Sequence, residues 1–141
     1  NNMAADDEKL ALAIGRAIQA TDAKIIYVAL AGSAMHSAAN ALGLRLAREG
    51  FADRQYDDDG NLASRSIPGT VIKDPAVARE QAIRMVRDGE VVSRHGKVIP
   101  VEVETLCVHG DEATGVAVAR EVRRGLEEAG IAVVPLPELI D

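Results

Sequence analysis

The sequence has 141 residues and a mass of 14.9 kDa, with 16 basic residues against 22 acidic ones and a net charge of −6 at pH 7. This length suits one domain with a sizeable core. The acidic balance argues against a nucleic-acid-binding protein, and the longest apolar runs, such as residues 25–31, are too short to span a membrane. A single cysteine, Cys107, excludes an internal disulfide framework. We therefore expect a cytoplasmic protein without nucleic-acid or membrane partners.

The first half of the chain alternates between helix and strand patterns. Residues 6–20 carry apolar side chains at helical spacing, and the apolar run over residues 24–30 predicts a strand buried on both faces. Ser33 is placed to cap a short alanine-rich helix, and residues 44–47 predict a second short strand. Turn residues then fill residues 51–69, and a long irregular loop in a compact domain is usually functional or mobile.

The second half continues the alternation. Asp74, followed by a proline, predicts the start of a helix that runs to Gly89. The elements predicted after it are a β-hairpin over 91–101, a buried strand over 104–109, a helix over 114–129 and a candidate strand over 131–134. Strands and helices joined by short connections predict parallel pairing and an α/β architecture. In such folds the chemistry collects at the carboxyl ends of the strands.

Two candidate residues follow the strand predicted over residues 104–109. The imidazole of His109, with an ordinary pKa of about 6.5, can exchange a proton near neutral pH. Asp111 could orient this imidazole, hold a substrate amine or cap the next helix. The same residues would also suit an ordinary strand-to-helix turn, so both interpretations remain open.

A second group of candidates comes at the end of the strand predicted over residues 44–47. Glu49 and Asp53 are carboxylates beside Arg54, an arrangement that suits general acid–base chemistry with a clamp for a substrate carboxylate. It equally suits a salt-bridged loop anchor. Arg65, later in the same loop, is a weaker candidate for the clamp.

Three other kinds of site find little support. Cys107 stands between apolar residues of a predicted strand, which indicates a buried structural thiol rather than a nucleophile. The spacing of the three histidines and the cysteine matches no zinc site. Residues 31–34 lack the further glycines and the lysine of a phosphate-binding loop, so no ATP site of that type is predicted.

Several stretches taken together resemble one protein family. They are residues 47–56, 64–72 and 108–111, in this order and with the predicted helix and hairpin between the last two. The combination of Phe51-Ala-Asp-Arg54 with Val108-His-Gly-Asp111 is the most specific part. On these residues the chain resembles the LamB/YcsF family over essentially its whole length.

The resemblance also implies that something is missing. Members of the family run to roughly twice this length, within the size range of a barrel, and the motifs of their amino-terminal half do not occur here. Residues 1–141 would then be the carboxy-terminal half of a single barrel domain without its amino-terminal half. The implied fold is α/β, the carboxy-terminal part of an incomplete (β/α) barrel related to the polysaccharide-deacetylase type, with parallel strands and a β-hairpin insertion.

The function that the resemblance implies is a subunit of an ATP-dependent 5-oxoprolinase, which opens 5-oxo-L-proline to L-glutamate. ATP would be bound with or by the other 5-oxoprolinase subunits. The sequence is compatible with a homo-oligomer. Whether a metal takes part stays open. Under this hypothesis the catalytic residues are His109, Asp111, Glu49 and Asp53, and the substrate-binding residues are Arg54 and Arg65.

The implied roles divide between the two strand ends. His109 and Asp111 would handle protons at the ring amide, while Arg54 would bind a carboxylate or phosphate and be oriented by Glu49 and Asp53. Two alternatives stay open. One is a non-catalytic assembly or binding subunit whose irregular loop docks partner subunits, and the other is a metal-dependent hydrolase of the deacetylase-like type, with its ligands in the missing half.

Overall fold

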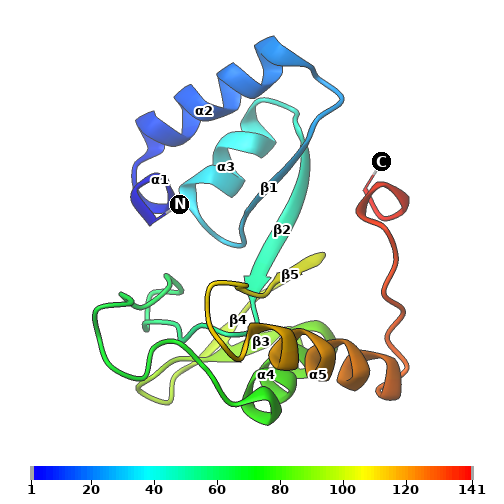
Figure 1. Cartoon of the computed structure of the whole chain (residues 1–141). Helices are drawn as coiled ribbons and strands as arrows, with labels where there is room; N and C mark the ends of the chain where they lie inside the picture. The colour runs from blue at the N-terminus through cyan, green and yellow to red at the C-terminus, as the bar shows by residue number, and fades with distance from the viewer. Residues whose placement is uncertain (1, 141) are drawn as a thin grey trace.

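The computed structural model describes residues 2–140 (Figure 1). The elements in chain order are α1 (Asn2–Asp6), α2 (Glu8–Thr21), β1 (Ile26–Leu30), α3 (Ala34–Ala41), β2 (Arg45–Phe51), α4 (Pro75–Arg87), β3 (Glu90–Val92), β4 (Val98–Pro100), β5 (Thr105–Cys107), α5 (Gly115–Glu128) and the short 3₁₀ helix η1 (Leu136–Glu138). Among these residues, no helix is both long enough and apolar enough to pass through a membrane.

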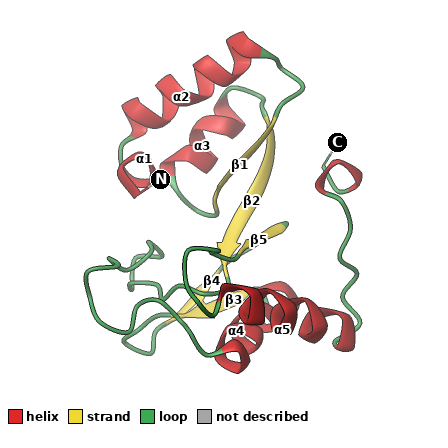
Figure 2. Ribbon diagram, in the orientation of Figure 1, coloured by secondary structure: helices red, strands yellow, loops and turns green. Residues whose placement is uncertain are grey.

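A three-stranded parallel sheet in the order β1–β2–β5 organises the molecule. The first part of β2 pairs with β1, with Arg45 opposite Ile26, and its last part pairs with β5, with Phe51 opposite Cys107. α3 packs on β1 and β2 and is itself covered by α2, whereas α4 and α5 pack on each other near β5 (Figure 2). The predicted α/β architecture with parallel strands is confirmed, and so is the hairpin, as antiparallel β3 and β4.

Side-chain caps determine where three of the helices begin. The carboxylate of Asp7 accepts hydrogen bonds from two backbone N–H groups of α2, so this helix starts at Glu8 rather than at the predicted position 6. Ser33 caps α3 and Asp74 caps α4, both as predicted, with Pro75 in the first position of α4. Each such cap contributes on the order of 1 kcal/mol.

Several strand predictions need correction. β1 is not buried on both faces within residues 2–140, since Val28 is 39% exposed. β2 is longer than residues 44–47, since the pairing with β5 extends it to Phe51. β5 is shorter and only half-buried. Residues 131–134 form no strand, because nothing in residues 2–140 pairs with them.

The loop predicted over residues 51–69 is irregular but closely bonded. The N–H of Gln55 donates to the carbonyl of Thr70 across its base, with an N–O distance of 2.9 Å. At its tip, the carboxylate of Asp58 accepts a hydrogen bond from the hydroxyl of Ser93 on the hairpin, at 2.5 Å. The loop is therefore held on both sides by the rest of the fold.

Candidate active site

The carboxyl ends of β2 and β5 lie side by side, and this edge carries the predicted site residues. Phe51 and Cys107 are paired, and the N–H of Ala52 continues the ladder to the carbonyl of Cys107 at 3.1 Å. Asp53 lies two residues beyond β2, and His109 lies two residues beyond β5. The parallel register thus brings together two residues that are far apart in the sequence.

Asp53 holds His109 at two points. Its carboxylate, 3% exposed, accepts from the backbone N–H of His109 at 2.6 Å and faces Nδ1 of the ring at 2.9 Å. Because a carboxylate only accepts hydrogen bonds, Nδ1 carries the proton and Nε2 is left to exchange one. The ring also stacks on Phe51, with centroids 5.8 Å apart and planes inclined by 27°. Asp53 in the turn after β2 sets the position and tautomer of the imidazole, and Phe51 at the end of β2 sets its plane.

Glu49 lies inside β2 rather than at its end, two residues before Phe51. Alternate residues of a strand point to the same side, so Glu49 and Phe51 share a face. Burial raises the pKa of Glu49, and the nearby His109 partly opposes this rise. A carboxyl group with a raised pKa beside an imidazole suits proton transfer.

Arg54 is a buried cation without a carboxylate partner among residues 2–140. One terminal nitrogen of its guanidinium donates to the carbonyl of Ala63 at 2.6 Å, and its buried Nε has no partner in the described chain. Burial lowers the pKa of Arg54, and the positive charge of Arg65 lowers it further. Buried charges are normally paired, so this guanidinium is suited to an anionic ligand.

No hydrogen bond or ion pair in residues 2–140 joins Arg54 to either carboxylate that was expected to orient it. Both oxygens of Asp53 are engaged by His109, and no hydrogen bond between Glu49 and Arg54 occurs in residues 2–140. An ion pair that would make Arg54 a salt-bridged loop anchor does not occur in these residues either. The arginine is instead held through the carbonyl of Ala63.

Asp111 neither orients the imidazole nor caps α5. It forms an exposed ion pair with Arg65, with an Nη1–Oδ2 distance of 2.9 Å. The hydrogen bond from Arg65 lowers the pKa of Asp111, which makes this carboxylate a weak base. Its geometry favours holding Arg65 near the edge of the sheet over accepting a proton from substrate.

Sequence reasoning missed Gln81 on α4. Its side-chain amide donates to the carbonyls of Phe51 and Arg54, both at 2.8 Å. The available signal was a polar residue between Ala78 and Ala82, which are fully buried on the same helix.

Neither a thiol with a lowered pKa nor a cluster of metal-ligating side chains occurs in residues 2–140. Cys107 is half-buried, and burial raises the pKa of its thiol to about 11, as suits a structural rather than a nucleophilic cysteine. No group of three or more His, Cys, Asp and Glu side chains within residues 2–140 is arranged to hold a metal ion.

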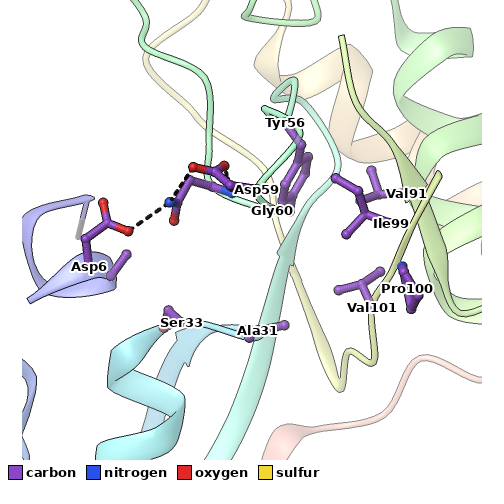
Figure 3. Close-up of a pocket in the computed structure, with 13 residues that line it drawn as sticks. Asp6, Ala31, Ser33, Tyr56, Asp59, Gly60, Val91, Ile99, Pro100 and Val101 are labelled. Carbon is purple, nitrogen blue, oxygen red and sulfur yellow. Dashed lines mark hydrogen bonds between the residues drawn. The ribbon is translucent and has the colours of Figure 1, made fainter. Parts of the chain in front are cut away.

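A cavity of about 380 Å³ lies at the carboxyl end of β1 (Figure 3). Asp6 and Asp59 stand on its polar side, and Val91 and Ile99 stand on its apolar side. The amide of Asn61 donates to both carboxylates, at 2.8 and 3.2 Å. None of the six predicted site residues lines this cavity, so it is distinct from the Asp53–His109 pair.

The start of α5 packs directly against the backbone of His109. A Cβ atom at Gly115 would lie 2.5 Å from the carbonyl oxygen of His109. Since backbone cannot move as a flexible side chain does, we expect Gly115→Ala to lower the free energy of unfolding by about 1–3 kcal/mol. Urea unfolding measures this, and Ala117→Ser on the exposed side of the same helix, a change of about 0.5 kcal/mol or less, is the control. Equal effects of the two would contradict the close contact.

The comparisons with known proteins agree with one another. The LamB/YcsF family pattern matches residues 1–141. The 5-oxoprolinase A subunit of Rhodopseudomonas palustris is 50% identical over 135 residues, which cover 96% of this chain and 53% of that protein. Its counterpart of the same name in Coprothermobacter proteolyticus is 47% identical, with 96% and 52% covered.

A solved structure is also similar. The crystal structure of a lactam utilization protein from Thermus thermophilus superposes with a TM-score of 0.82 at 40% identity, covering 92% of this chain and 51% of that one. The chain thus spans about half the length of the curated relatives it matches. On the match over its full length, the chain belongs to the LamB/YcsF family.

Proposed function

We propose that this chain forms part of the active site of an ATP-dependent 5-oxoprolinase, the cytoplasmic enzyme that opens 5-oxo-L-proline to L-glutamate. The observation that carries the proposal is the imidazole of His109, fixed by the buried Asp53 with its Nε2 free for proton exchange. The relatives named as 5-oxoprolinase subunits and as a lactam utilization protein support the same reaction.

The chemistry of lactam opening explains why such residues are needed. The amide carbon is a poor electrophile, so the amide oxygen first takes the γ-phosphoryl group of ATP, which is bound with or by partner subunits, and ADP is released. Water then attacks the carbon, the C–N bond breaks, and the ring nitrogen takes up a proton to leave as an amine. A second water releases phosphate from the acyl phosphate and leaves the new carboxylate. A positioned proton donor at the nitrogen contributes about 10²–10⁴-fold to such a step.

In this scheme Nε2 of His109, which carries no proton in the Nδ1–H tautomer, takes a proton from the attacking water and passes it to the ring nitrogen. Glu49 is the second group able to hold a proton. Arg54 binds the carboxylate that 5-oxoproline carries beside the ring, because this guanidinium is buried beside the site without a counter-ion in residues 2–140. Arg65, held by Asp111, adds positive charge at the same edge.

Residues 1–141 are, in this proposal, the carboxy-terminal half of a single incomplete (β/α) barrel of the deacetylase-like type. Within residues 2–140, β1 and β5 each have a strand neighbour on one side only. An apolar groove of about 560 Å³ also opens between β5, α5 and the tail that includes η1. The amino-terminal half would supply further strands at these edges.

One reconstitution tests both parts of the proposal. The chain extended by the amino-terminal half of a close relative and mixed with the partner subunits is expected to release glutamate from 5-oxoproline only when ATP is present. Residues 1–141 with the same partners are expected to be inactive, because part of the barrel is absent. Equal activity of the two forms would contradict the half-barrel, and no activity in either would contradict the assigned reaction.

A further inference from the structure

One side chain outside the predicted site is bound to the turn that carries it. The amide nitrogen Nε2 of Gln81 lies 2.8 Å from the carbonyl oxygen of Phe51, 3.3 Å from that of Ala52 and 2.8 Å from that of Arg54. All three partners are acceptors, so the group that faces them is the NH₂ of the amide. A single side chain thus bonds to the backbone before and after Asp53.

Gln81 itself stands on a fixed support. It lies in the middle of α4, whose neighbouring residues Ala78, Ala82 and Met85 are almost completely buried. Two of these residues, the alanines, belong to the apolar cluster that packs α4 against α5. Because α4 is packed in the core, the amide of Gln81 can hold the turn over residues 51–54 at a constant distance from the core.

The turn held by Gln81 determines the state of the imidazole. Phe51 supplies the surface on which His109 stacks, and Asp53 supplies both acceptors for the ring and the backbone of His109. A shift of the 51–54 backbone would move both contacts together. The backbone N–H of Ile72, on the opposite side of the loop, also donates to the backbone carbonyl of Asp53, at 2.8 Å.

We infer that Gln81 is a positioning residue, which fixes the turn over residues 51–54 so that Asp53 holds His109 in the Nδ1–H tautomer. Gln81 touches no reacting atom and acts through Asp53 and Phe51. This inference rests on the proposed function for its effect on activity, but its effect on the imidazole is independent of that function.

The test uses the chain extended by an amino-terminal half, as in the reconstitution above, with two variants that both lose the donor. Gln81→Met keeps the length of the side chain, and Gln81→Glu keeps its shape while turning a carboxylate toward three carbonyls. Glu80→Met, on the exposed side of the same helix, is the matched control. The readouts are the ring ¹⁵N NMR shifts of His109, its backbone amide shift, and the turnover of 5-oxoproline with the partner subunits.

We expect both Gln81 variants to move the His109 ring shifts toward the mixture of tautomers found in a free imidazole, and to lower kcat by roughly 10- to 100-fold, as small misplacements of reacting groups do. The control should leave both unchanged. Unchanged His109 shifts in a folded variant would overturn the inference, whatever the activity. Displaced shifts with full turnover would support the positioning role and overturn the catalytic role of His109.

Discussion

Under the proposed function, replacing His109 by alanine is expected to lower the turnover of 5-oxoproline by roughly 10²-fold or more, because the variant loses the imidazole proposed to carry the proton. The expectation applies to the chain extended by an amino-terminal half and mixed with the partner subunits that the proposed function requires. The imidazole is held by Asp53 and stacked on Phe51, so it is preorganised for one proton transfer through Nε2. Steady-state release of glutamate, dependent on both 5-oxoproline and ATP, measures the effect.

Two further variants make this result specific. His95→Ala removes an imidazole at the exposed tip of the hairpin and should leave turnover unchanged. Asp53→Asn keeps the size of the side chain, but its amide NH₂ can donate to Nδ1 of His109 and so favours the tautomer with the proton on Nε2. This variant should therefore lose a large share of the same activity. Turnover of His109→Ala within about twofold of the parent would remove His109 from the proposed mechanism.

The sequence was sufficient to predict this edge of the sheet but not the contacts within it. The strand-end rule predicts Asp53 and His109 at the carboxyl ends of two strands, and the structure shows that these strands are neighbours, paired as β2 and β5. The direction of each side chain depends on the turn geometry after β2, which no spacing rule supplies. Adjacency in the sequence therefore linked Asp53 to Arg54 and left Asp111 among the options for the imidazole, whereas Asp53 is the residue that binds it.

The errors in the fold have a related cause. Helix starts at Ser33 and Asp74 depend on local side-chain caps, and these were predicted correctly. Burial of a strand depends on its neighbours, which lie elsewhere in the chain. An apolar run of residues such as that of β1 therefore occurs in edge strands as well as in central ones. Residues 131–134 also have the apolar pattern of a strand, but no strand in residues 2–140 pairs with them.

Arg54→Met is expected to separate binding from stability. If the buried guanidinium binds the substrate carboxylate, its removal should raise KM by roughly 10²-fold, since breaking a buried charged pair costs about 2–5 kcal/mol. Stability should change little. Leaving the carbonyl of Ala63 without its donor lowers stability by about 1–3 kcal/mol. Removing a buried, unpaired charge also removes its desolvation cost, which offsets this loss by a similar or larger amount.

Arg45→Met is the matched control, because Arg45 also donates only to carbonyls, those of Lys24 and Ile140, but lies at the opposite end of β2. It should leave KM unchanged, because Arg45 lies away from the candidate site. An Arg54→Met variant with unchanged KM and a stability loss above about 3 kcal/mol would instead make Arg54 an anchor of the loop. The expected outcome is the reverse, since a cation kept in the core without a carboxylate partner among residues 2–140 adds little to folding and much to the binding of an anion.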